Sequence, residues 1–147
     1  RGLIIPWSWV QSPPGPPSKS IQGATMRVGY VVLYVNDVDA CSKFWTEKFD
    51  MAVRETMQVG VDTVVRVGFT DQNFSLELVP LSMMKDNPDG LDLASPSMCF
   101  YVDNLAEEHN KLSQRSVEVT ELMEHFETKN FAFSDNEGRW FAVVEGK

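Results

Sequence analysis

Apolar residues recur along this chain in two spacings, which predict a mixture of strands and helices. From residue 26 onward, short apolar runs bounded by Gly, Asn and Asp are typical of strands. Helical spacing occurs in two segments, one marked by Val38, Cys41, Trp45 and Phe49, the other by Leu105, His109 and Leu112. The pattern therefore predicts two helices set among strands.

Both helical segments follow copies of one short motif. The segment LYVNDV at 33–38 recurs as FYVDNL at 100–105, an offset of 67 residues. In each copy an Asp or Asn stands where a helix would begin, because its side-chain oxygen can accept from the free N–H groups of the first turn. Three strand-like runs follow each helix, at 51–58, 62–68 and 74–80 and again at 117–123, 129–134 and 139–145. The chain therefore predicts a βαβββ unit that occurs twice.

We expect one α+β domain over residues 26–147, with modules at about 26–80 and 97–146 and a linker at 81–96. Residues 1–25 differ in composition, since they hold five of the eight prolines and no acidic residue. We interpret this stretch as a Pro-rich arm that is a leader or sequence added upstream of the domain, with a natural extension as the alternative.

Charge and cysteine content narrow the classes of function. The 147 residues carry 13 Lys and Arg against 21 Asp and Glu, a net charge of -8, which disfavours binding to a phosphate backbone. No apolar run approaches the roughly 18 residues of a transmembrane helix. Cys41 and Cys99 are too few for a disulfide framework and are typical of free thiols in a reducing compartment. We therefore expect a cytoplasmic protein that binds neither nucleic acid nor membrane.

Four segments carry a resemblance to a known family: RVGYVVLYVNDVDACSKFWTEKFDM, SLELVPL, SMCFYVDNLAEEHNKL and FSDNEGRWFAVVEGK. In this order they resemble the vicinal oxygen chelate superfamily, which includes glyoxalase I, bleomycin-resistance proteins and extradiol dioxygenases. The similarity covers about residues 26–146. It implies two βαβββ modules that form a curled mixed sheet around a cleft, and it implies a homodimer. It does not fix the activity, because one fold serves many functions.

Metal-dependent members of that superfamily bind the ion at four inward positions. By resemblance, these positions match Tyr30 and Ser97 on the first strands and Glu77 and Ala142 on the last strands. Only Glu77 is a competent ligand, whereas an open catalytic metal site needs about three protein ligands. We therefore expect no metal and no other cofactor.

Strand alternation places further side chains on the cleft side, so that Cys99 accompanies Ser97 and Trp140 accompanies Ala142. The candidate ligand-binding residues are Tyr30, Glu77, Ser97, Cys99, Trp140 and Ala142. Aromatic faces beside one acid suit a partly apolar, cationic aromatic ligand. A structural alternative is that Glu77 pairs with Arg54 or Arg66 rather than with a ligand.

Three hypotheses for function remain. The favoured one is metal-independent binding or sequestration of a small molecule, such as a cationic aromatic drug, as in the bleomycin-resistance branch, where binding confers antibiotic resistance. The second is a lyase, isomerase or dioxygenase-like enzyme with Glu77 as general base and Arg54, Arg66 or Tyr30 as an anion-stabilising partner. The third is an interaction module without a small ligand. No nucleophile–base pair emerges, because the pattern places no His beside Cys99.

Overall fold

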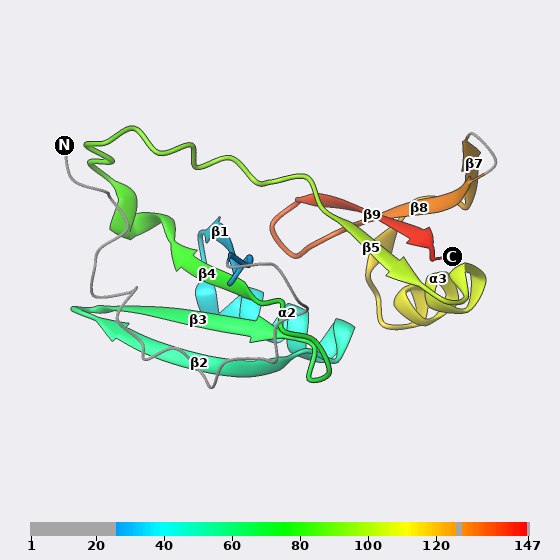
Figure 1. The fold of residues 1–147 in the computed structure, drawn as a ribbon, viewed down its shortest axis with the longest axis horizontal. Coiled ribbons are helices and arrows are strands. Elements are labelled where there is room, and N and C mark those ends of the chain that lie inside the picture. Colours follow the sequence, from blue (N-terminus) through cyan, green and yellow to red (C-terminus); the bar gives the residue numbers. More distant parts are fainter. Residues whose placement is uncertain (1–25, 126–127, 147) are drawn as a thin grey trace.

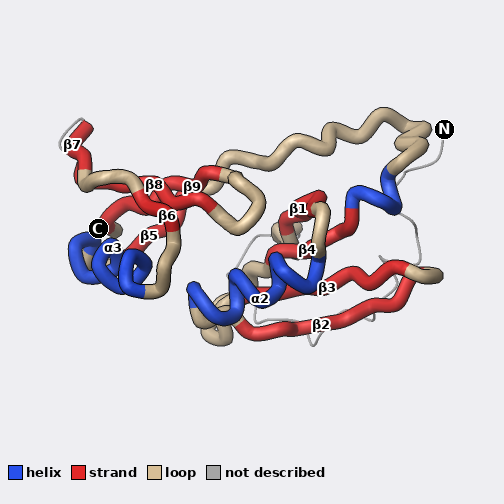
Figure 2. Tube along the Cα trace, turned by 180° about the vertical axis from the view of Figure 1, so that it is seen from behind, coloured by secondary structure: helices blue, strands red, loops and turns tan. Residues whose placement is uncertain are grey.

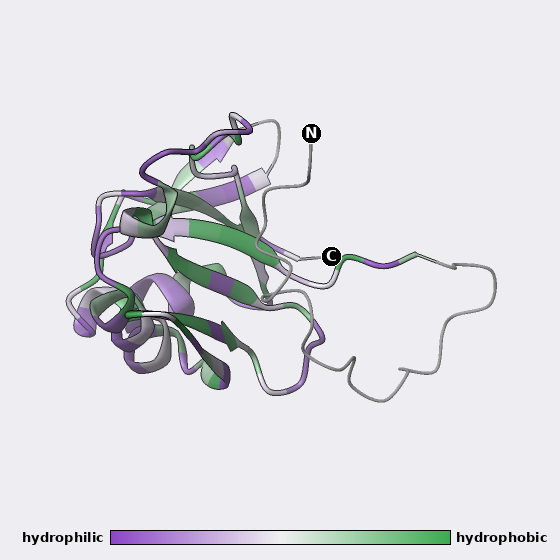
Figure 3. Ribbon diagram, turned by 90° about the vertical axis from the view of Figure 1, so that its left-hand side faces the viewer, coloured by the Kyte–Doolittle hydropathy of each residue, from purple (hydrophilic) through white to green (hydrophobic). Residues whose placement is uncertain are grey.

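The computed structural model describes residues 26–125 and 128–146, which form two modules lying side by side (Figure 1). The arm expected at 1–25 lies outside the described residues. Within them, neither helix is long and apolar enough to span a membrane. Apolar colour concentrates on the strands, whereas much of the helix ribbon has hydrophilic colour (Figure 3).

The first module is a βαβββ unit with a mixed sheet of four strands. Its elements are β1 (Val31–Val35), α2 (Val38–Phe49), β2 (Ala52–Val59), β3 (Asp62–Gly68) and β4 (Leu76–Pro80). The strand order is β1-β4-β3-β2, in which β1 and β4 are parallel and the other pairs antiparallel. A short 3-10 helix, η1 (Leu81–Met84), then opens the linker, which crosses to the second module in Figure 1.

The second module repeats this arrangement with a separate sheet. Its elements are β5 (Cys99–Val102), α3 (Leu105–Gln114), β6 (Glu118–Val119), β7 (Met123–His125), β8 (Thr128–Ser134) and β9 (Trp140–Glu145). The order is β5-β9-β8-β6, with β7 also pairing with β8. The single strand expected at 117–123 is interrupted at Thr120, whose hydroxyl accepts from the Ala132 amide at 2.9 Å in place of a backbone carbonyl. The α+β class and the repeated unit are confirmed.

Each helix begins at the residue type that the sequence predicts. Asp37 caps α2, its Oδ1 accepting from the Ala40 amide at 3.0 Å. Asn104 caps α3 by accepting from the Glu107 amide at 3.0 Å. Each helix packs against the sheet of its own module (Figure 2).

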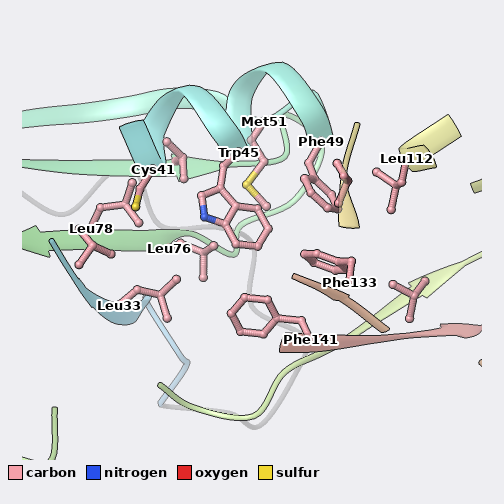
Figure 4. Close-up of a cluster of buried hydrophobic side chains, with 14 of the residues drawn as sticks. Leu33, Cys41, Trp45, Phe49, Met51, Leu76, Leu78, Leu112, Phe133 and Phe141 are labelled. Carbon is pink, nitrogen blue, oxygen red and sulfur yellow. The ribbon is translucent and has the colours of Figure 1, made fainter. Parts of the chain in front are cut away.

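The helix side of both sheets forms one shared core. Trp45 on α2 is fully buried, and its ring centroid lies 6.1, 6.0 and 5.7 Å from those of Phe100, Phe133 and Phe141 in the second module. Figure 4 shows Trp45 projecting from α2 toward Phe133 and Phe141. Aromatic pairs at these separations add to the burial of apolar area. The two modules are therefore expected to fold together.

Polar contacts also join the two modules, at a pair of residues that we call the polar latch (Glu137 and Arg139). Glu137, in the turn between β8 and β9, accepts from the amides of Asn36 at 2.8 Å and Asp37 at 2.9 Å, at the start of α2. Arg139 pairs with Glu137 at 3.0 Å and donates to the Tyr34 carbonyl at 2.7 Å. Burial acts to raise the pKa of Glu137, but these amide and guanidinium donors outweigh it, so the pKa lies below its ordinary value.

Candidate functional site

Glu77 and Ala142 hold equivalent positions in the two sheets. In the parallel pair of the first module, Glu77 lies opposite Val32, and in that of the second, Ala142 lies opposite Cys99. Val32 and Cys99 are themselves one repeat apart in the sequence. The strand register therefore agrees with the matching of these positions made from the sequence.

Three charged side chains lie across neighbouring strands of the first sheet. Arg66 on β3 is opposite Glu55 on β2 and Glu77 on β4. Arg66 Nε donates to Glu77 Oε2 at 2.6 Å, and Arg66 Nη1 donates to Glu55 Oε2 at 3.0 Å. Arg66 thus shares its single positive charge between two carboxylates, which limits how far it neutralises Glu77.

Tyr30 completes this group, which we call the Arg66 cluster (Tyr30, Glu55, Arg66 and Glu77). The Arg66 Cζ atom lies 4.0 Å from the centroid of the Tyr30 ring, a cation–π contact. Burial raises the pKa of Tyr30, and the Glu77 charge adds to that shift. The pKa of Tyr34 is raised for the same two reasons. Both phenols therefore stay protonated at neutral pH and keep a hydroxyl to donate.

One oxygen of Glu77 is left unsatisfied. The Glu77 side chain is 0% exposed, and its Oε1 has no hydrogen-bond partner within the part of the chain that the structure describes. Burial raises the pKa of this carboxyl, and the Arg66 hydrogen bond opposes the shift without cancelling it. Because buried polar atoms are nearly always paired, a lone buried carboxylate oxygen marks a place where a donor is missing.

The linker covers the sheet face beside Glu77. Val79 lies two residues further along β4 and forms a buried apolar cluster with Val64 and Met84. Partly buried side chains pack against this cluster, among them Met83, Leu91 and Leu93 of the linker. A ligand that reached Glu77 from this side would therefore displace a methionine-containing segment rather than a paired strand.

The corresponding face of the second sheet is open, and its positions that match Arg66 and Glu77 carry no charge. Ser97 and Cys99 are exposed, Trp140 is 48% exposed, and Ala142 is half-buried. Ala142 pairs with Ala132 across β8 and β9, where the first sheet pairs Glu77 with Arg66. The second module thus has the backbone pattern of the first without its Arg–Glu pair.

The structure thus divides the expected site residues into two sets. Arg66 links Glu77 of the first sheet with Tyr30, which directly precedes β1. The others belong to the second sheet or its lead-in: Ser97, Cys99, Trp140 and Ala142. Between the two sets, the described residues form no hydrogen bond, ion pair or ring contact.

The neighbours of Glu77 were only partly foreseen. The alternatives for its partner were Arg54 and Arg66, and Arg66 is the partner, whereas Arg54 donates to the carbonyls of Phe69 and Gln72. Glu55 was not among the residues predicted from the sequence. A signal existed, because Glu55, Arg66 and Glu77 follow one another at intervals of 11 residues on three consecutive predicted strands.

The donor set does not fit a divalent metal. Among the described residues, no group of three or more His, Cys, Asp or Glu side chains lies together so as to hold an ion. Glu77 is the one acid at the four positions considered, and its neighbour Tyr30 is a protonated phenol.

Sequence comparison identifies the family of this chain. The family model described as "Glyoxalase/Bleomycin resistance protein/Dioxygenase superfamily" matches residues 27–143, most of the chain. Among curated proteins, no match is found.

Solved structures agree on the fold. UcmS2 is 22% identical, with a TM-score of 0.68 over 82% of this chain and 98% of its own. TnmS3, an antibiotic binding protein from Streptomyces sp. CB03234, is 16% identical, with a TM-score of 0.69 over 85% and 99%. Lactoylglutathione lyase from Agrobacterium tumefaciens is 19% identical, with a TM-score of 0.63 over 90% and 96%. At these identities the likeness concerns the fold alone.

Proposed function

The chain belongs to the glyoxalase, bleomycin resistance protein and dioxygenase superfamily, and within it we propose that this protein binds or sequesters a small molecule at Glu77 without a metal. The observation that carries the proposal is the buried Oε1 of Glu77, which lacks a hydrogen-bond donor among the described residues. A ligand ammonium or N–H group would supply that donor. An antibiotic-binding protein among the structures of similar fold supports the same class of function.

The surroundings of Glu77 favour a partly apolar, cationic aromatic ligand. The rings of Tyr30 and Tyr34 are half-buried beside the carboxylate and offer faces that attract cations and stack on flat rings. Val32 and the linker methionines supply apolar surface. Drug resistance would follow from sequestration of such a compound.

We infer that a second copy of the chain completes the site. Within one chain, the face with Cys99, Trp140 and Ala142 belongs to a different sheet from Glu77, and Tyr101 beside it is 78% exposed. A homodimer would place this face against the cluster of its partner. Light scattering should give twice the chain mass, and Tyr101→Arg should lower it; a monomer at micromolar concentration would contradict the dimer.

The cytoplasmic location remains a prediction from two unpaired thiols.

The binding proposal is tested with two flat dyes of similar size, cationic proflavine and neutral acridone. Glu77→Gln should weaken proflavine binding by about 10- to 100-fold, as expected for a lost charge-assisted hydrogen bond, and should affect acridone little. Glu47→Gln, the same change at an exposed residue of α2, is the matched control and should leave both affinities unchanged. Equal proflavine affinity in wild type and Glu77→Gln would refute the proposal.

The second candidate is an enzyme in which Glu77 acts as general base. The raised pKa of Glu77 favours it, because a base is most effective when its pKa lies near the working pH. The same variant separates the two cases, since an enzyme would retain binding in Glu77→Gln and lose turnover.

A further inference from the structure

A cavity of about 550 Å³ lies at the seam between the two modules, away from the Arg66 cluster. Its walls come from both modules, including the end of α2, the turn between β3 and β4, strand β5 and helix α3. We call it the seam pocket. Of the six residues expected at the ligand site, Cys99 lines it and the other five do not.

The walls of the seam pocket are apolar and largely aromatic. Its lining includes Phe49, Phe69, Phe74, Met98, Phe100 and Leu112. The charged residues in the lining, Glu108 and Lys111 on α3, pair with each other at 2.8 Å. The pocket therefore presents no unbalanced charge among the described residues. Its volume falls within the range of about 300–1,000 Å³ that is usual for small-molecule sites.

The wall contributed by the first module is held in a defined shape. Arg54 donates hydrogen bonds to the carbonyls of both Phe69 and Gln72, which fixes the turn between β3 and β4. Gly68 lies directly before this turn, where an added Cβ would be 2.6 Å from the Phe74 carbonyl oxygen. Only a glycine allows that close approach. This wall is thus preorganised, which lowers the cost of binding.

We propose that the seam pocket is a second binding site, which takes a neutral, mainly apolar aromatic molecule. It differs from the Glu77 site in chemistry, because it offers aromatic surface without a free charge. Since its walls come from both modules, an occupant would contact both and stabilise their association. The proposal is independent of the function assigned to Glu77.

The test uses Nile red, a neutral aromatic dye whose fluorescence rises in apolar surroundings, with four forms of the full chain. Wild type should bind one dye per seam pocket, and Met98→Arg should weaken this binding at least about tenfold by placing a charge in an apolar wall. Met83→Arg is the matched control, because Met83 is equally half-buried but packs in the linker cluster. Glu77→Gln should also bind like wild type. Loss of dye binding in Met83→Arg or Glu77→Gln with retention in Met98→Arg would overturn the proposal.

A second measurement on the wild-type protein does not depend on any variant folding. In a single chain Cys99 is exposed, whereas Cys41 is buried and burial raises its pKa to about 12. In protein diluted until light scattering gives the mass of one chain, N-ethylmaleimide should therefore label Cys99 alone. Dye at about ten times its Kd should slow this labelling about tenfold, because only the unoccupied fraction reacts. Saturated dye fluorescence with an unchanged labelling rate would place the dye elsewhere and overturn the proposal.

Discussion

The two modules of this protein share a backbone plan and differ on the sheet face opposite their helices. In the first, Arg66 and Glu77 pair across strands β3 and β4 and lie inside the molecule. In the second, Ala132 and Ala142 occupy the matching pair, and the nearby Trp140 is 48% exposed. At these matching positions the first module has an ion pair on a face that the linker covers, and the second module has two alanines on an open face.

The sheet faces that pack against the helices are apolar in both modules. In the first module Leu33 and Trp45 are buried, and in the second Phe133 and Phe141 are buried against Trp45. This side must stay apolar, because it forms the shared core and a polar substitution there would cost stability. The opposite faces carry no such requirement. The comparison therefore points to them as the surfaces where function has specialised.

The pKa shifts of Glu137 and Glu77 distinguish a carboxylate that stabilises the fold from one whose charge does not. Donors around Glu137 lower its pKa, so its negative charge stabilises the fold. Burial raises the pKa of Glu77, so its charge costs stability at neutral pH. A buried charge that the fold does not need is a better candidate for ligand binding than one that caps a helix.

The largest expected effect comes from truncating a side chain in the core that the two modules share. Trp45→Ala should lower the free energy of unfolding by about 4 kcal/mol, because it leaves a cavity that both modules line. Chemical denaturation followed by circular dichroism measures this change. Trp140→Ala, the same change at a half-exposed position, should cost less than about 1 kcal/mol. Similar losses in the two variants would mean that Trp45 does not join the modules.

The polar latch should give a smaller, pH-dependent effect. Glu137→Gln should cost about 2 kcal/mol at pH 7, because it weakens the hydrogen bonds from Asn36 and Asp37. Since the pKa of Glu137 is lowered in the fold, its contribution is present above the ordinary carboxyl pKa and is lost as pH falls through the lowered value.

Urea unfolding at pH 7 and at about pH 3 should therefore show the cost shrinking in acid. Glu145 serves as control, because it is exposed and accepts from the Leu105 amide of α3 at 3.3 Å within its own module. Its Gln variant should differ little from wild type at either pH. A cost for Glu137→Gln that stays constant with pH would contradict the ionic role of the latch.

Glu77 should respond to pH in the opposite sense. Because its pKa is raised in the fold, the stability that it contributes is present below the ordinary carboxyl pKa and is lost as pH rises through the raised value. Glu77→Gln should therefore be more stable than wild type at pH 8, by about 1 kcal/mol or less, and equal to it near pH 4. Thermal unfolding across this range measures the difference. A variant less stable than wild type at pH 8 would show that the Arg66 pair supports the fold.

The smallest expected effect is that of divalent metals. Of the four metal-binding positions that the family resemblance implies, three are occupied by Tyr30, Ser97 and Ala142. Zinc, nickel, manganese or iron(II) should therefore shift the melting temperature by less than about 1 °C, because a ligand stabilises the fold only when its concentration exceeds its Kd. Elemental analysis of protein purified without chelators is the companion measurement. One tightly held ion per chain would show that other donors complete a site.

Local pattern was sufficient for the helices and most strands. The spacing of Val38, Cys41, Trp45 and Phe49 matches the four buried residues of α2, since a helix repeats every 3.6 residues regardless of its surroundings. The match of Glu77 with Ala142 came instead from the family resemblance, and the strand register places the two residues at equivalent positions. The interruption at Thr120 was not predicted, because it depends on a side-chain hydrogen bond to another strand.

The sequence by itself determined the repeated βαβββ plan and the helix caps, because each depends on residue type and short-range periodicity. The tertiary structure alone decided that Arg66 rather than Arg54 pairs with Glu77, and that Glu137 caps a helix about 100 residues away. It also produced the seam pocket from two separate modules. Such contacts arise from how whole elements pack, and no local spacing encodes which distant side chains will meet.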